Sequence, residues 1–153
     1  MTLQIPVSTS LLTVDLLPSN DRDVLKQSLI LSYNLRKRKW FGQFVDIDIV
    51  DDVSDIPCTK ITFSDQSSVK VSSHTRILCR TNDSNKYFTV SADSATVGMV
   101  CVTPTDMSGC SLSKLSRRYI TAIEPVVKKQ IMRHIVPKMI GYVTIDPGIV
   151  ICV

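Results

Sequence analysis

The chain has 153 residues and a formal net charge of +4, with 44% hydrophobic and 21% charged residues. This balance excludes a disordered chain, and the length suits one domain that buries about two thirds of the surface exposed when it is unfolded. No apolar run approaches the ~20 residues of a membrane-spanning helix, and no basic segment precedes the first apolar run as in a secretory signal, so we expect an intracellular protein, cytoplasmic or nuclear.

Two apolar runs punctuated by prolines open the chain. Pro6 cannot donate to an interior ladder, so residues 1–18 are expected to contain an edge strand or to form an extended N-terminal arm. The sequence then predicts a helix from Asp21 to Lys39. Ser19 or Asn20 can cap this helix, and acidic residues occupy its first turn, where the helix dipole favours anions.

From Phe44 onward the pattern changes to alternation, beginning with the run FVDIDIV. Further β-prone runs follow at short intervals, separated by clusters of Ser, Asn, Asp or Pro: CTKITF, SVKV, TRILCR, KYFTV and TVGMVCV. This spacing predicts a meandering antiparallel sheet.

A helical pattern returns after Pro104. Ser111 or Ser113 can cap it, and its apolar residues share one face: Leu112, Leu115, Tyr119 and Ile123. Pro125 either starts a second helix or kinks a continuing one, and Pro137 ends the segment.

The chain closes with GYVTIDPGIVICV, two β-prone runs joined by Asp146, Pro147 and Gly148, which predicts a hairpin. The apolar last run must pair within the sheet, pack into a partner or belong to a longer parent chain. The expected fold is therefore a single α+β domain over residues 1–153. It is mostly an antiparallel sheet or partly closed barrel, with one N-terminal helix and one kinked or split basic helix near the C-terminus.

Cations concentrate in the last third of the chain, where residues 107–153 hold 7 Lys or Arg against 2 Asp or Glu. Most lie opposite the apolar stripes of the predicted helices, so they can neutralise phosphates of nucleic acid or anionic lipid headgroups. The alternative is an ordinary solvated basic face. The candidate contact residues are Lys114, Arg117, Arg118, Lys128, Lys129 and Arg133.

A second basic cluster lies in NLRKRKWFGQF and comprises Arg36, Lys37, Arg38 and Lys39. In the last turn of the predicted helix these cations meet the helix dipole favourably, which indicates a structural cap. A nuclear-import or polyanion contact is the alternative.

The five cysteines lack the spacing of zinc or redox motifs, so we expect reduced, mostly buried thiols, with no metal and no cofactor. His74, Asp93 and Cys110 occur in the order that resembles the chymotrypsin-like viral cysteine proteases. That resemblance implies a small cysteine-dependent hydrolase, although the glycine after the nucleophile is missing and the chain has strands for about one of the two barrels. Asp46 and Asp48 share a strand face that is either solvated or able to hold a hard cation or an acid and base pair.

The leading hypothesis is a non-enzymatic binding or assembly protein whose basic helices contact nucleic acid, an anionic membrane or a protein. A viral structural, matrix or movement-type protein is one form of this hypothesis. HIVPKMIGYVTIDPGIVICV resembles a β-segment of plant viral movement proteins of the thirty-kilodalton type, which bind nucleic acid and modify plasmodesmata. An apolar last strand and an N-terminal arm also favour strand exchange, hence a homo-oligomer or a protein partner on the C-terminal hairpin. The alternative is the hydrolase with His74, Asp93 and Cys110.

Overall fold

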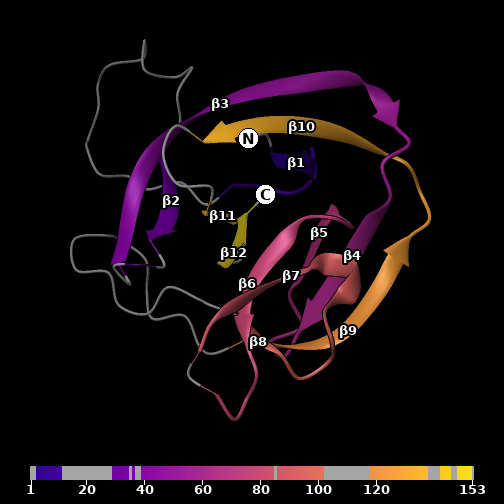
Figure 1. Cartoon of the computed structure of the whole chain (residues 1–153). Helices are drawn as coiled ribbons and strands as arrows, with labels where there is room; N and C mark the ends of the chain where they lie inside the picture. The colour runs from indigo at the N-terminus through magenta and orange to yellow at the C-terminus, as the bar shows by residue number, and fades with distance from the viewer. Residues whose placement is uncertain are drawn as a thin grey trace.

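The computed structural model describes residues 3–11, 29–34, 36, 39–84, 86–101, 118–137, 142–145 and 148–152, and strands dominate them. Figure 1 labels these elements. In chain order they are β1 (Leu3–Pro6), β2 (Leu29–Asn34), β3 (Lys39–Ser54), β4 (Cys58–Phe63), β5 (Ser68–Ser72), β6 (Arg76–Arg80), β7 (Phe88–Ser91), the 3-10 turn η2 (Ala92–Ser94), β8 (Val100–Cys101), β9 (Arg118–Val126), β10 (Gln130–Pro137), β11 (Val143–Ile145) and β12 (Ile149–Cys152).

The strands form one antiparallel sheet in the order β1-β10-β3-β2-β11-β12-β6-β8-β9-β4-β5, with β7 paired to β6. The 16-residue β3 pairs with β2 through its first part and with β10 through the rest, and Figure 1 shows it arching over one side of the molecule. The two ends of the strand order, β1 and β5, contact each other. Thr9, just after β1, donates its hydroxyl to the Lys70 carbonyl of β5 (2.6 Å). The sheet therefore curls until its edges meet.

The core is aliphatic and follows the two-residue period of the strands. On β12, Ile149 and Ile151 enter the main core cluster, as Ile77 and Cys79 do on the neighbouring β6. The residues between them face the other way, where Val150 packs with Tyr33 and Leu78 in a smaller cluster. Both faces of β12 are therefore buried, and the burial of its apolar side chains stabilises this strand in the sheet.

The α+β prediction is wrong, because no α-helix occurs among the described residues. The expected helix from Asp21 to Lys39 overlaps β2 and runs into the start of β3, while residues 21–28 lie outside the described part. Leu29–Asn34 pairs residue by residue with Lys39–Phe44, across a turn that contains Arg36. This pairing overrides a helical spacing that was counted over too few residues to be distinguished from alternation.

The prediction of basic helices after Ser111 is also wrong in the described residues, because strand pairing again overrides the helical spacing. Arg118–Val126 forms β9 and Gln130–Pro137 forms β10. The first four residues of β9 alternate between buried and exposed, as a strand requires. Runs rich in Ile, Val and Thr favour strands once a partner is available, and β4 and β3 supply the partners.

The hairpin prediction at the end of the chain is confirmed, since β11 and β12 pair from Val143–Ile151 to Ile145–Ile149. Gly148 takes a φ of +126°, which a side chain would strain, and donates its N–H to the Ile145 carbonyl (2.7 Å). The apolar last strand pairs within the sheet, between β11 and β6. No helix in the described part is long and apolar enough to cross a membrane.

Candidate functional site

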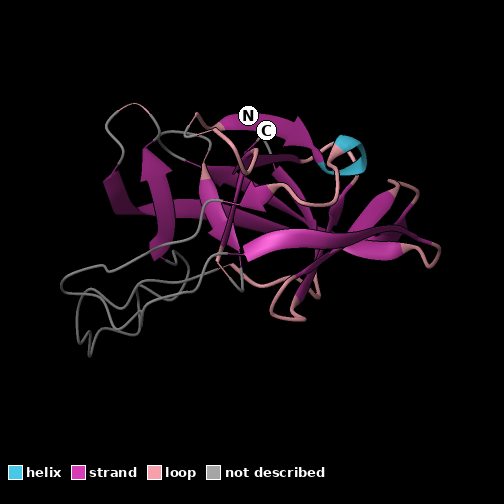
Figure 2. Cartoon of the chain, turned by 90° about the horizontal axis from the view of Figure 1, so that it is seen from below, coloured by secondary structure: helices cyan, strands magenta, loops and turns pink. Residues whose placement is uncertain are grey.

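The two chain ends lie next to each other, as the N and C marks show in two perpendicular views (Figures 1 and 2). The C-terminal strand β12 sits in the middle of the sheet order, whereas β1 is at one end of it. The curl of the sheet brings that end back toward the centre. Chemical groups beside either end can therefore act on the same small region.

Cys152 is the last described residue, and its thiol is a nucleophile next to the C-terminal end of the chain. It lies directly opposite Arg76 in the β12–β6 register and is 6% exposed. Burial raises the pKa of the Cys152 thiol, and the positive charge of Arg76 opposes that rise. The thiol is thus protonated at neutral pH but has a cation beside it that favours the thiolate.

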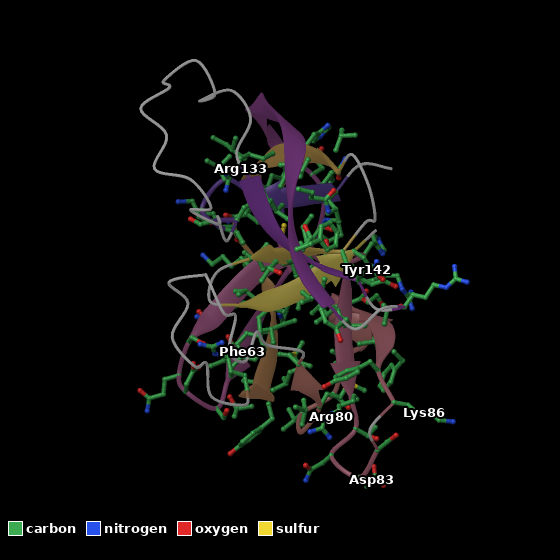
Figure 3. All side chains as sticks on the ribbon, turned by 90° about the vertical axis from the view of Figure 1, so that its left-hand side faces the viewer. Phe63, Arg80, Asp83, Lys86, Arg133 and Tyr142 are labelled. Carbon is green, nitrogen blue, oxygen red and sulfur yellow. The ribbon has the colours of Figure 1, made fainter. Side chains whose placement is uncertain are left out.

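Arg76 and Tyr142 complete this cluster. Arg76 is fixed by two hydrogen bonds to Thr89 on β7, from Nε to the hydroxyl (2.9 Å) and from Nη2 to the carbonyl (2.8 Å). Burial and the neighbouring Cys152 raise the pKa of the Tyr142 phenol, while Arg76 lowers it. Thiol, phenol and guanidinium therefore interact electrostatically, and Figure 3 shows Tyr142 near the middle of the molecule.

A second polar group, of buried hydroxyls, lies around the β5–β6 turn. The hydroxyls of Ser72 and Thr75 are 2.7 Å apart, and those of Thr59 and Ser73 are 2.8 Å apart. All four residues are buried, so each hydroxyl satisfies the other without water. The pairs hold the turn that precedes Arg76.

The triad of the alternative hypothesis, His74, Asp93 and Cys110, is described at two of its three positions. His74 is exposed in the β5–β6 turn. Asp93 belongs to the adjacent η2, and its backbone N–H donates to the Ser73 carbonyl (3.2 Å). No hydrogen bond joins the His74 and Asp93 side chains in the described part of the chain. Cys110 lies outside it. Asp46 and Asp48 fall on β3, and their side chains are likewise not described.

Two of the candidate cations after Ser111 have structural partners of their own. Arg118 is 6% exposed and donates from Nε to Asp65 (2.6 Å). Lys129 pairs with Asp55 at the surface (2.5 Å).

Of the remaining predicted cations, the structure describes the side chains of Arg133, Lys128 and Arg36. Arg133 donates from Nη2 to the carbonyls of Val7 and Thr9, which fixes the turn after β1. Lys128 and Arg36 are exposed. Lys39 starts β3 with an undescribed side chain, and the others lie outside the described residues: Lys37, Arg38, Lys114 and Arg117.

No group of three or more His, Cys, Asp or Glu suitable for a metal ion occurs among the described residues. Sequence reasoning counted Cys152 only among the reduced, mostly buried thiols and gave Arg76 and Tyr142 no role. No local signal could have found this cluster, since its members come from β12, β6 and the residue before β11.

No family model matches the chain, and no curated protein does. Solved structures match over its full length. An intein from a hyperthermophile aligns with a TM-score of 0.71 at 15% identity and covers 100% of both chains. The fold is that of inteins. The DnaB intein from Synechocystis sp. PCC 6803 has a TM-score of 0.67 at 12% identity over 100% of this chain and 99% of its own. The DnaX mini intein from Spirulina platensis has 0.65 at 18%, over 98% and 99%.

The intein fold overturns the leading hypothesis drawn from the sequence. The matching structures are protein-splicing domains, so a non-enzymatic binding or assembly protein of viral, nucleic-acid-binding or membrane-associated type is wrong. The movement-protein resemblance loses its support with it. Inteins catalyse peptide-bond rearrangement, which also contradicts the expectation of a non-enzyme. The cysteine-dependent alternative was closer to this chemistry.

Proposed function

We propose that this chain is a self-processing domain that rearranges peptide bonds at its own ends. The observation that carries the proposal is the match of the whole chain to the intein fold, which brings the two ends side by side (Figure 2). Holding two reacting groups together replaces a bimolecular encounter with an intramolecular one, an advantage that can lower a barrier by about 7–11 kcal/mol. Inteins, which share this fold, are protein-splicing domains.

The candidate nucleophile is the thiol of Cys152. A cysteine Sγ can reach the carbonyl carbon of the residue before it through a five-membered ring, and here that bond joins Ile151 to Cys152. Attack by the thiolate forms a thioester on the Ile151 carbonyl and frees the Cys152 amine. Water or a second thiol then resolves the thioester and releases the segment that starts at Cys152.

Two neighbours support this step. Arg76, opposite Cys152, favours the thiolate over the thiol by its positive charge. The Tyr142 phenol is the candidate donor of a proton to the departing amine, because its own pKa responds to Cys152. Since burial keeps the thiol largely protonated, processing should be slow at neutral pH and faster as the pH rises.

The test is a fusion of the chain between two reporter proteins of different mass. After purification, incubation from pH 7 to pH 9 with and without a small thiol should give smaller products, identified by mass spectrometry. Cys152→Ala should abolish the thiol-stimulated product, whereas Cys58→Ala, a matched buried thiol on β4, should retain it. A fusion that stays intact under every condition would exclude the function. Products that persist unchanged in Cys152→Ala would exclude this nucleophile but not the function.

The proposed chemistry requires a reduced thiol. The four cysteines in the described part of the chain are free: Cys58, Cys79, Cys101 and Cys152. Reduced cysteines are typical of proteins in the cytosol. These thiols support our proposal that the activity operates inside the cell, in the cytoplasm.

A further inference from the structure

Two buried cysteines face each other across neighbouring strands, away from Cys152. Cys79 on β6 is the direct partner of Cys101 on β8. They are 0% and 3% exposed, and both belong to the main core cluster. Residues directly opposite in an antiparallel pair project from the same face of the sheet, so the two thiols point into the same part of the core.

The register places the two Cα atoms at a separation compatible with a disulfide. Directly opposite residues have Cα atoms about 4.5 Å or about 5.5 Å apart, depending on the alternation of the ladder. Both separations lie inside the ~4.4–6.8 Å range of natural disulfides. The other described cysteines lack such a partner, since Cys58 lies opposite Ser72 and Val126, and Cys152 lies opposite Arg76.

A cation completes the row. Arg118 on β9 is the direct partner of Cys101, so the three side chains follow one line across β6, β8 and β9. The Arg118 Nη1 is buried and has no hydrogen-bond partner among the described residues. A guanidinium with an uncommitted donor stabilises a thiolate formed beside it.

We propose that Cys79 and Cys101 are a redox modification site, a dithiol that a small-molecule disulfide converts reversibly into a cross-strand disulfide, with Arg118 favouring the Cys101 thiolate. With oxidised glutathione, the Cys101 thiolate attacks one glutathione sulfur and releases one glutathione thiolate. The Cys79 thiolate then attacks the Cys101 sulfur of this mixed disulfide and releases the second glutathione. The two protein sulfurs are oxidised, the two glutathione sulfurs are reduced, and the two thiol protons pass to the glutathione thiolates.

Access to the pair depends on β8. This strand is only two residues long, and burial keeps the pKa of Cys79 at about 11 and that of Cys101 at about 12, the latter also raised by Cys79 and lowered by Arg118. Reaction in the closed sheet is therefore slow. Local opening of the short β8 admits the oxidant, and once formed the bond ties β8 to β6.

The test oxidises the purified, folded chain with mixtures of reduced and oxidised glutathione and maps disulfides by mass spectrometry without reduction. Trypsin isolates Cys79 in the peptide Ile77–Arg80, whereas Cys101 shares the peptide Tyr87–Lys114 with Cys110. A Cys110→Ala background therefore makes the assignment unique. The expected product is the linked pair of peptides, lighter by two hydrogens, which disappears on reduction.

The linked product should be lost in Cys101→Ala and retained in Cys58→Ala. Oxidation should raise Tm by about 5 °C, because the bond closes a loop of the unfolded chain. Arg118→Gln should slow the linkage several-fold, while Asp65→Asn, which removes the ion pair but keeps the guanidinium, should not. Because slow access could hide the reaction in the folded state, the same oxidation is repeated during refolding from urea. Absence of the Cys79–Cys101 link in both experiments, or preferential linkage of other cysteines, would overturn the proposal.

Discussion

The ion pair between Asp65 and Arg118 makes a specific part of this protein's stability depend on pH. Burial tends to raise the pKa of the Asp65 carboxyl, but hydrogen bonds from Ser67 and Arg118 outweigh it and lower that pKa from 3.8 to about 2. At about 1.36 kcal/mol per pKa unit, this shift corresponds to at most about 2.4 kcal/mol. The Asp65 side chain is 31% exposed, so solvent screening reduces the expected contribution to about 1 kcal/mol.

The sign follows from the lowered pKa. The unfolded chain binds the Asp65 proton more readily than the folded chain does, so the contribution is fully present above the unfolded value of 3.8. It is lost as the pH falls through about 2. Neutral pH therefore shows the full effect, and strongly acidic pH shows none.

The assay compares urea unfolding of the wild-type chain and Asp65→Asn at pH 6, pH 4 and pH 3. An asparagine keeps an oxygen that can accept the Ser67 hydrogen bonds and removes only the charge. We expect a difference in unfolding free energy of about 1 kcal/mol at pH 6 that shrinks by about half at pH 3. Asp83→Asn is the matched control, because Asp83 is exposed and makes no ion pair within the described residues (Figure 3). A difference of equal size at all three pH values would refute the electrostatic reasoning.

Three further predictions concern the core, the turns and the candidate nucleophile. Phe63→Ala, at a side chain 1% exposed, should lower the unfolding free energy by about 3–5 kcal/mol in urea titrations, whereas Phe88→Ala, 37% exposed, should cost less than about half of that. Gly98→Ala should destabilise the protein by about 1 kcal/mol in the same assay, because φ is +96° at this position, although nothing lies within 4 Å of an added Cβ. Gln66→Gly should be neutral or stabilising, because Gln66 has a φ of 70°. The raised pKa of Cys152 predicts that its alkylation by iodoacetamide is slower at pH 7.5 than that of free cysteine and increases about tenfold per pH unit up to pH 9.

Each of these predictions has an outcome that contradicts it. Equal losses for Phe63 and Phe88 would show that burial does not set the cost. Destabilisation by Gln66→Gly as large as that of Gly98→Ala would argue against backbone strain at these two turns. Labelling of Cys152 that is fast and insensitive to pH would show that the thiol is not desolvated.

Local pattern was sufficient for the strands whose alternation is sustained and whose turns carry strong signals. The run CTKITF became β4, and VTIDPGIVIC became the β11–β12 hairpin, because Gly148 supplies a conformation that other residues avoid. Local pattern failed at β2, β9 and β10. These strands depend on partners that the sequence does not reveal, as β9 pairs with β4 and β10 with both β1 and β3.

The cations show the same limitation at the level of single residues. The basic stripe was inferred by placing Arg118 and Arg133 on the outside of helices. In strands, Arg118 instead faces inward to Asp65, and Arg133 turns to the carbonyls of Val7 and Thr9. A phosphate contact through Arg118 Nε or Arg133 Nη2 would have to break these internal bonds. The pairing of Cys152 with Arg76 could not be predicted from the sequence either. It exists only through the register of β12 against β6, and the sequence does not reveal which strands pair.

The position of β12 has a consequence for any bond broken at Cys152. β12 is the central strand of the main path through the sheet, with β11 on one side and β6 on the other. Its pairs with β11 end at Ile151, so cleavage between Ile151 and Cys152 would leave all three of them in place: Val143–Ile151, Thr144–Val150 and Ile145–Ile149. The side chains of Ile149 and Ile151 would remain in the core. A processed domain should therefore keep its fold and most of its stability, and the pairing of Cys152 with Arg76 of β6 holds the thiol in place before the reaction.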